Sequence, residues 1–252
     1  MSNIFDALGK KREEEGGSGE GPPPFEPVLH VSLESVGEID FQLGRELEPL
    51  RERIDLELPR TGRKVFGVSG SVRGEGATTI AASLARSMAR ASGARALLVD
   101  ADFARGPGSL ARHVAPEDEP IPGLVELLAG RIDLSQAIAA TEEPSLHVIT
   151  TGREPVRPMD LVGSQRMRQF LDDMGQLYRA VIVDCPPILD HPESPMLGAL
   201  TSGVALVVRA HQTRREVVQR ALALLQGARC PVLGVILNER RYPIPGFLYR
   251  RL

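Results

Sequence analysis

Short apolar runs alternate with longer amphipathic segments along most of the chain, and this alternation limits the possible folds more than any other feature. The β-branched or apolar runs are predicted strands: KVFGVSGS (64–71), ARALLVDAD (94–102), SLHVITT (145–151), RAVIVDCPP (179–187), GVALVVRA (203–210) and CPVLGVILN (230–238). Segments with apolar residues at i, i+3 and i+4 are predicted helices: TTIAASLARSMARA (78–91), GLVELLAG (123–130), DLSQAIAA (133–140), SQRMRQFLDDMGQLY (164–178) and RREVVQRALALLQGA (214–228). Such repeated βα units predict a three-layer α/β fold, with a doubly wound, mostly parallel sheet and helices on both faces.

The sequence divides into three parts. Residues 1–40 include the charged, glycine- and proline-rich stretch EEEGGSGEGPPPFEP (13–27), so they are predicted to be a disordered segment and linker. Residues 1–11 are either a short partner-docking helix or a frayed terminus. The folded domain is predicted at 41–239 and begins with a helical pattern over 41–58. Residues 240–252 form a basic and aromatic tail.

Composition argues against several classes of protein. The 252 residues carry a net charge of −3, so the basic footprint of a nucleic-acid-binding protein is absent and no nucleic acid partner is expected. No apolar run is long enough to span a membrane, and the N-terminus lacks the apolar core of a secretory signal. We therefore expect a cytoplasmic protein that reaches a membrane only through a partner. Cys185 and Cys230 lie in apolar runs, which predicts buried, reduced thiols.

The turn after the first predicted strand has the features of a phosphate-binding loop. The stretch SGSVRGEGATT (69–79) leads from a strand into a helix, and its glycines let backbone N–H groups converge on an anion. The usual loop ends in Gly-Lys-Ser/Thr, whereas this chain has alanine at the lysine position. The residues expected to bind nucleotide are Gly74, Glu75, Gly76, Ala77, Thr78 and Thr79. The alternative is that the glycines serve only a tight turn.

The missing lysine has no replacement of its own kind. The chain's lysines are Lys10, Lys11 and Lys64, all before the loop, and Arg73 is either a substitute cation or a solvated loop residue. Losing one charge-assisted hydrogen bond weakens nucleotide binding by roughly 1.5–3 kcal/mol. Losing a cation where charge develops slows phosphoryl transfer by ~10²–10³. We therefore expect slow catalysis or none, unless an arginine or a neighbouring subunit compensates.

Acidic residues stand at the ends of two other predicted strands. Asp100 and Asp102 end the strand at 94–102, and Asp184 ends the apolar part of the strand at 179–187. The carboxyl ends of parallel strands form the ligand-binding edge of an α/β sheet. At that edge, Asp184 is expected to hold Mg²⁺ through water, and the Thr78 hydroxyl is expected to contact the ion directly.

The loop and the two aspartate-bearing strands resemble those of the bacterial tyrosine autokinases of capsule and exopolysaccharide synthesis. These are P-loop NTPases of the partitioning-ATPase-like class. The resemblance covers about Glu46 to Leu252 and includes the linking segments GLVELLAGRIDLSQAI (123–138) and LHVITTGREPVRPMDLVGS (146–164).

This resemblance implies a set of ligands, roles and partners. It implies ATP or ADP with Mg²⁺ as ligands, Asp100 and Asp102 as the catalytic acidic motif near the transferred phosphate, and Asn238 at the adenine edge. It also implies an inner-membrane polysaccharide co-polymerase, or chain-length regulator, as the partner, together with self-association.

The chain departs from the family at three places. Ala77 replaces the loop lysine, and Val72 stands where related partitioning ATPases have their second lysine. The family's glutamate-arginine-arginine pattern for ring assembly aligns with Arg45, Glu48 and Arg51, so two charges are exchanged and the ring is in doubt.

The third departure is in the tail. The family's tail is rich in tyrosine. The tail of this chain has only Tyr242 and Tyr249 as candidate phosphoacceptors, beside four arginines. The tail is a phosphate acceptor, a basic-aromatic patch for an anionic lipid or membrane partner, or plain edge packing. Tyr178 is expected to be a packing residue, and His211 a turn residue.

Three hypotheses follow for the function. The first is a nucleotide-binding regulator of polysaccharide polymerisation and export with autokinase activity on the tail. The second is a pseudokinase that serves as an interaction scaffold, which the missing lysine favours. The third is a partitioning-type ATPase that positions cargo, which the absence of both lysines disfavours.

Overall fold

A computed structural model of the chain describes residues 26–33, 48–52, 54, 64–92, 95–103, 110 and 121–239. These residues form an eight-stranded sheet in the order β1-β4-β5-β3-β6-β2-β7-β8. Its strands are β1 (Leu29–His30), β2 (Val65–Gly70), β3 (Ala96–Asp100), β4 (Ile138–Ala140), β5 (Leu146–Ile149), β6 (Ala180–Asp184), β7 (Val204–Arg209) and β8 (Val232–Asn238). All neighbouring strands are parallel except β4 and β5. The predicted doubly wound, mostly parallel sheet is therefore confirmed.

The helices connect these strands, and α7 and α8 begin at residues suited to helix starts. They are α3 (Ala77–Ser92), α5 (Leu124–Leu128), α6 (Leu134–Ala137), α7 (Pro158–Gly163), α8 (Gln165–Leu177), α9 (Glu193–Ala199) and α10 (Arg215–Gly227). The Ser164 hydroxyl accepts a hydrogen bond from the Met167 N–H at 3.1 Å, which caps α8. Pro158 occupies the start of α7, where a missing N–H is tolerated.

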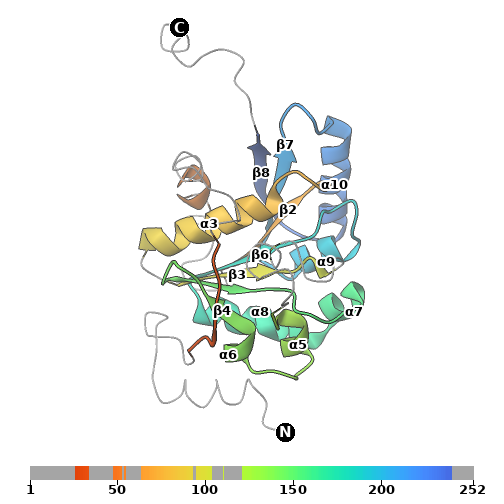
Figure 1. The fold of residues 1–252 in the computed structure, drawn as a ribbon. Coiled ribbons are helices and arrows are strands. Elements are labelled where there is room, and N and C mark those ends of the chain that lie inside the picture. The colour runs from red at the N-terminus through yellow and green to blue at the C-terminus, as the bar shows by residue number, and fades with distance from the viewer. Residues whose placement is uncertain are drawn as a thin grey trace, which may run out of the picture.

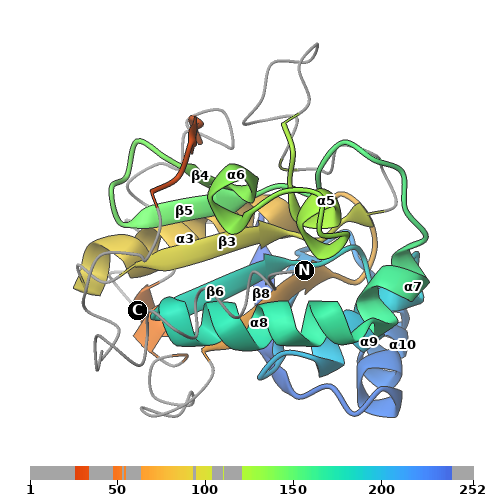
Figure 2. The ribbon, with the colours of Figure 1, turned by 90° about the horizontal axis from the view of Figure 1, so that it is seen from below.

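Helices cover both faces of the sheet. Helix α3 lies on one face, and α5 and α8 lie on the other, as Figure 1 and the turned view in Figure 2 show. Successive residues of a strand point to opposite faces. Accordingly, Leu98 of β3 packs in the core on the α3 side, whereas Leu97 and Val99 pack in the core on the α8 side.

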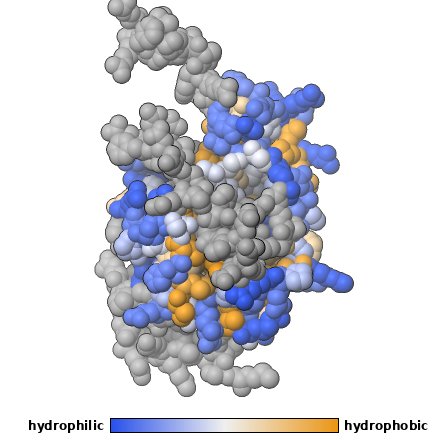
Figure 3. All heavy atoms as spheres, viewed as in Figure 1, coloured by the Kyte–Doolittle hydropathy of each residue, from blue (hydrophilic) through white to orange (hydrophobic). Residues whose placement is uncertain are grey.

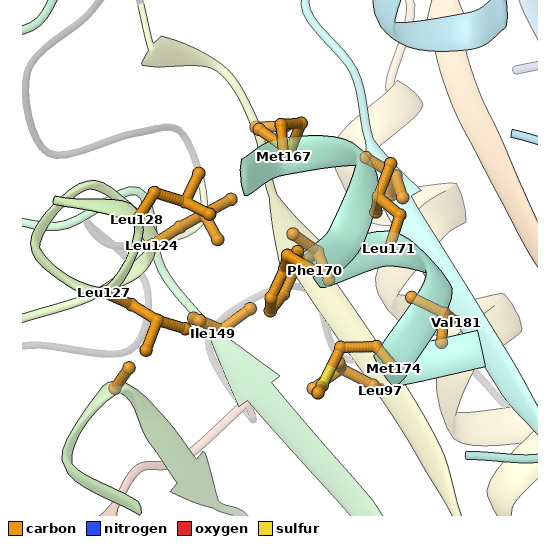
Figure 4. Close-up of a cluster of buried hydrophobic side chains, with 14 of the residues drawn as sticks. Leu97, Leu124, Leu127, Leu128, Ile149, Met167, Phe170, Leu171, Met174 and Val181 are labelled. Carbon is orange, nitrogen blue, oxygen red and sulfur yellow. The ribbon is translucent and has the colours of Figure 1, made fainter. Parts of the chain in front are cut away.

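The core on the α8 side is centred on an aromatic ring. Figure 4 shows Phe170 of α8 between Leu124 of α5 and the sheet residues Leu97 and Val181. Phe170 is 1% exposed, so its packing stabilises the fold. Removing a buried ring of this kind costs roughly 3–5 kcal/mol.

Two strands lie outside those predicted. Strand β1 falls within residues 1–40, which the sequence analysis assigned to linker, and it pairs with β4. Leu33 just after it is fully buried, and its N–H donates to the Glu142 carboxylate at 3.0 Å. Strand β4 ends the segment 133–140, predicted as one helix, because residues 138–140 pair antiparallel with β5. Tertiary pairing overrides local helical periodicity there.

The predicted helix at 41–58 is described only in part. Residues 48–52 and 54 are helical, and Leu50 and Ile54 pack against the core on the α3 side. Arg45 lies outside the described residues, and so do Tyr242 and Tyr249. The domain boundaries at 41 and 239 stay predictions, and β1 and Leu33 show that residues before 41 also pack on the sheet.

The described surface is mostly hydrophilic in the view of Figure 3, with apolar residues in small patches. Exposed apolar side chains include Val235 and Leu237 on β8, the strand at one edge of the sheet. Within the described ranges, no helix combines the length and the apolar character that a membrane crossing requires.

Candidate nucleotide-binding site

The loop between β2 and α3 makes a tight turn that depends on glycine. Gly74 and Gly76 both have φ of +85°, a region that L side chains rarely adopt. A Cβ on Gly76 would also lie 2.3 Å from Asn238 Nδ2, so glycine is required there for space as well. Helix α3 starts at Ala77, which places the N–H groups of its first turn at the loop.

Ala77, at the predicted lysine position, is the first residue of α3. Ala77 is half-buried, and its methyl group packs against the core on the α3 side. Thr78 and Thr79 follow on the same turn and are partly exposed. The helix has no acidic residue in its first turn, so its positive end is not neutralised from within the helix.

Glu75 differs from its neighbours in the loop because its side chain is buried. The residue is 2% exposed. Its Oε2 accepts from the Val72 N–H at 3.0 Å, and its Oε1 accepts from the Arg209 N–H at 3.4 Å and from the Thr213 hydroxyl. The carboxylate is thus bonded to the protein, although the sequence analysis grouped Glu75 with the nucleotide-binding residues.

The three predicted aspartates come together at the carboxyl ends of neighbouring strands. Asp100 of β3 and Asp184 of β6 are register partners, and Asp102 follows two residues after Asp100. All three are at least nine-tenths buried. The carboxylate of Asp100 accepts from the Asp102 N–H at 3.1 Å and from the Leu110 N–H at 3.0 Å. Asp100 therefore shapes the turn that carries Asp102.

Unsatisfied buried oxygens gather at this same edge. Four buried side-chain oxygens in the described part of the chain have no hydrogen-bond partner, and three of them lie one or two residues after the ends of β2, β3 and β5. They are Ser71 Oγ, Asp102 Oδ1 and Thr150 Oγ1. A buried oxygen without a partner is unfavourable, so a ligand, ion or water would stabilise this edge.

The loop after β6 lies against the phosphate loop. The N–H groups of Ile188 and Leu189 donate to the carbonyl oxygens of Gly70 and Ser71, at 2.9 and 3.0 Å. The Arg73 N–H donates to Asp190 Oδ2 at 3.3 Å. Sequence analysis missed Asp190, because nothing near it in sequence signals a contact with a loop more than a hundred residues away.

Asn238 lies beside the phosphate loop. Its Nδ2 donates to the Glu75 carbonyl at 2.9 Å, and its Oδ1 accepts from the Glu239 N–H at 2.9 Å. Both ends of the amide therefore already have a partner within the chain. The adenine role implied by the resemblance stays a prediction.

Three residues outside the loop occupy the positions expected of them. His211 is exposed in the turn between β7 and α10, with φ of +62°. Cys185 and Cys230 are buried and free, as predicted. Burial raises the pKa of Cys185 well above its usual value, with the charge of Asp184 adding to the effect. Burial also raises the pKa of Cys230 to about 11, so both thiols stay protonated near neutral pH.

The acids at this edge fit a cation only together with other ligands. In the described ranges, no group of three or more His, Cys, Asp or Glu residues lies close enough to hold a metal ion. The unpartnered Asp102 Oδ1 and the buried Asp184 are hard oxygen donors of the kind that Mg²⁺ prefers. Because Mg²⁺ keeps several waters and phosphate oxygens, a small protein donor set suits it.

Known proteins resemble this chain in sequence. A family model described as an AAA domain matches residues 64–213. Tyrosine-protein kinase YwqD of Bacillus subtilis is 32% identical over 191 residues, covering 75% of this chain and 78% of YwqD. Tyrosine-protein kinase ptk of Acinetobacter johnsonii is 30% identical over 201 residues, covering 80% of this chain. The chain spans only 27% of the length of ptk.

Solved structures resemble it in fold. The kinase domain of the Escherichia coli tyrosine kinase ETK has a TM-score of 0.73 at 24% identity, covering 93% of this chain and 89% of that domain. Cobyrinic acid a,c-diamide synthase of Mycobacterium smegmatis, solved with an ATP analog and magnesium, has a TM-score of 0.56 at 20% identity, covering 73% of this chain and 84% of the synthase.

Proposed function

The chain belongs to the bacterial tyrosine-protein kinase family of P-loop NTPases, and from this premise we propose that it binds ATP or ADP with Mg²⁺ and regulates polysaccharide synthesis. The protein would control capsular or exopolysaccharide polymerisation and export from the cytoplasmic side of the membrane. The inner-membrane polysaccharide co-polymerase would be its partner. Nucleotide state or tyrosine phosphorylation would change its assembly with that partner.

One observation carries the nucleotide part of this proposal. The phosphate loop and the three buried aspartates, which are far apart in sequence, meet at the carboxyl edge of adjacent strands β2, β6 and β3. Thr78 and Asp184 would hold the Mg²⁺, with Asp102 beside the transferred phosphate. The ion would supply the positive charge that polarises the phosphate oxygens. Backbone N–H groups of the loop and of the first turn of α3 would bind the phosphates.

The absence of the lysine bears on rate more than on binding. Without a cation at position 77, we propose that nucleotide is held by the amides and Mg²⁺, while phosphoryl transfer is slow. Arg73 is exposed in the loop, and it is the nearest candidate in sequence for a replacement cation.

Tyr242 and Tyr249 would be the phosphoacceptors of an active kinase. The third tyrosine, Tyr178, is 4% exposed, and its hydroxyl lies 2.7 Å from His147 Nδ1. Because its oxygen is buried and hydrogen-bonded, Tyr178 is unsuited to phosphorylation in the folded protein. This leaves the two tyrosines of the tail.

Calorimetric titration with ATP and ADP, with and without Mg²⁺, tests the binding. We expect Mg²⁺-dependent binding by the natural chain, and binding about 10- to 150-fold tighter by Ala77→Lys. Ala77→Gln is the matched control because it adds length without charge, and it should gain little. If neither the natural chain nor the lysine variant binds nucleotide, the proposal is wrong.

A second candidate is a pseudokinase scaffold, which the observation of alanine at position 77 favours. Incubation with Mg-ATP followed by detection of phosphotyrosine separates the two candidates. Phosphate on Tyr242 or Tyr249, lost in the Tyr→Phe variants, would exclude the scaffold. Nucleotide binding without any phosphotyrosine, in the presence of the membrane partner, would support it.

A further inference from the structure

The buried Glu75 carboxylate connects the phosphate loop to a distant part of the sheet. Its Oε2 accepts from the Val72 N–H within the loop. Its Oε1 accepts from the Arg209 N–H, at the end of β7, and from the Thr213 hydroxyl, in the turn before α10. The last two partners are 134 and 138 residues away in sequence. One side chain therefore fastens the loop to the turn between β7 and α10.

The main chain of the same residue makes a second connection. The Glu75 carbonyl accepts from Asn238 Nδ2 at the end of β8, 163 residues away. The loop is thus held at Glu75 by three segments: its own start, the turn after β7, and the end of β8. The segment after β6 holds the loop at Gly70, Ser71 and Arg73. Beyond that point, Gly74 and Gly76 have φ of +85° and wide conformational freedom, so the contacts of Glu75 restrict this part of the loop.

The surrounding glycines fit this arrangement closely. A Cβ on Gly70 would lie 3.0 Å from Glu75 Oε2, and a Cβ on Gly76 would lie 2.3 Å from Asn238 Nδ2. Space beside the loop is therefore filled by the Glu75 carboxylate and the Asn238 amide. Larger residues at either glycine would displace these groups.

We infer that Glu75 is a positioning residue, which holds the phosphate loop in its nucleotide-binding conformation through Thr213, Arg209 and Asn238 and does not itself contact nucleotide. The inference rests on the proposed nucleotide site. A loop without lysine depends on its backbone amides for affinity, so their pre-organisation matters more than in a loop with the cation. The buried negative charge is balanced by two N–H groups and a hydroxyl.

Substitutions at Thr213 test the inference without touching the loop. Thr213→Val removes the hydroxyl donor, and we expect it to weaken ATP and ADP binding by a similar factor, on the order of tenfold. Thr213→Ser retains the donor and should restore the natural affinity. Glu75→Gln turns one acceptor into a donor that faces an N–H, and it should weaken binding at least as much. Failure of serine to restore affinity would overturn the inference.

Glu126 provides a matched control. It is also buried, and its carboxylate accepts from the N–H groups of Gly123, Arg153 and Glu154 at 2.8–3.0 Å. Two of these partners, Arg153 and Glu154, follow β5, which lies three strands away from β2, roughly 14 Å across the sheet. Glu126→Gln should lower the melting temperature but leave nucleotide affinity unchanged. An equal loss of affinity in Glu126→Gln and Glu75→Gln would mean that Glu75 has no specific role.

Amide hydrogen exchange in the nucleotide-free protein separates this inference from the proposed function. In Glu75→Gln, the amides of Val72 and Arg209 should exchange at least tenfold faster, while those of Val181 and Val183 in the central strand β6 stay unchanged. This result would hold even if the natural chain bound no nucleotide. Unchanged exchange at both Val72 and Arg209 would overturn the inference.

Discussion

The two ends of the central strands β3, β5 and β6 both carry buried polar groups, but these groups are satisfied by one another at one end and partly unsatisfied at the other. At the carboxyl ends are Asp100, Asp102 and Asp184, together with the phosphate loop. At the amino ends, His147 and Tyr178 form a buried pair next to Arg95. Both ends belong to the same sheet, so the fold alone does not explain the difference.

The polar groups at the amino end bind one another. His147 Nδ1 lies 2.7 Å from the Tyr178 hydroxyl, and the two rings meet edge to face with centroids 5.6 Å apart. Burial lowers the pKa of His147 to about 4, with the nearby charge of Arg95 adding to the effect. Burial also raises the pKa of Tyr178. Both side chains are therefore neutral near pH 7, and the pair needs no outside partner.

At the carboxyl ends of the strands, the buried polar groups do not all satisfy one another. Asp102 Oδ1 has no hydrogen-bond partner, and the same is true of Ser71 Oγ and Thr150 Oγ1. A buried polar atom without a partner is unfavourable unless a ligand, ion or water provides one. The comparison shows that buried polar groups serve stability where they satisfy one another. Where they are left unsatisfied together, they mark the edge that receives a ligand.

Among substitutions that test the contrast between the two ends of the strands, Gly76→Ala should have the largest effect on stability and nucleotide binding. Gly76→Ala forces an L side chain into φ of +85° and against Asn238, so we expect a loss of roughly 1–3 kcal/mol in unfolding free energy and loss of nucleotide binding. Chemical denaturation and calorimetric titration measure the two effects. Gly227→Ala, where an added Cβ meets nothing within 4 Å, should show neither. Full binding in Gly76→Ala would contradict the assignment of the loop.

Asp100→Asn should have the next largest effect. Both carboxylate oxygens accept hydrogen bonds from backbone N–H groups. In asparagine, the side-chain nitrogen would replace one of these oxygens, so two donors would face each other and one hydrogen bond would be lost. We expect a loss of roughly 1–3 kcal/mol in unfolding free energy, measured by urea denaturation. Asp102→Asn should have a smaller effect on stability, because Asp102 Oδ1 has no partner to lose. The reverse order would refute this reading of the two aspartates.

The amino end predicts a pH dependence of stability. Because the folded pKa of His147, about 4, lies below its ordinary value of 6.5, the unfolded chain binds the proton more readily. The contribution is therefore fully present above pH 6.5 and is lost as the pH falls from 6.5 to 4. Urea denaturation between pH 4 and 6.5 gives the unfolding free energy of the natural chain and of His147→Gln. This free energy should change less with pH in the variant. Equal slopes would mean that His147 does not titrate as stated.

The smallest effect is expected at Tyr178. Tyr178→Phe keeps the ring but removes the hydroxyl bonded to His147, so we expect a loss of about 0.5–1.5 kcal/mol in unfolding free energy. Nucleotide affinity should be unchanged, because the residue lies at the other end of the strands. A change in affinity would show that the two ends are coupled.

Local patterns were enough to locate most of the fold. The six predicted strands all appear, because continuous β-branched runs bounded by turn residues suit strands covered on both faces. Glycine spacing located the loop, and acids at strand ends located Asp100, Asp102 and Asp184. Strands β1 and β4 were not foreseen, since each is three residues or fewer and exists through pairing.

The sequence by itself determined the order of βα units, the absence of lysine from the loop and the acids at the strand ends, because these depend on residues close together in the chain. Only the tertiary structure decided that Glu75 meets Thr213 and Asn238, and that His147 meets Tyr178. Those contacts arise because the sheet order places β2 beside β7, with β8 next to it, and β5 beside β3, with β6 next to it. Pairing between distant strands follows from the packing of the whole sheet, which no local pattern records.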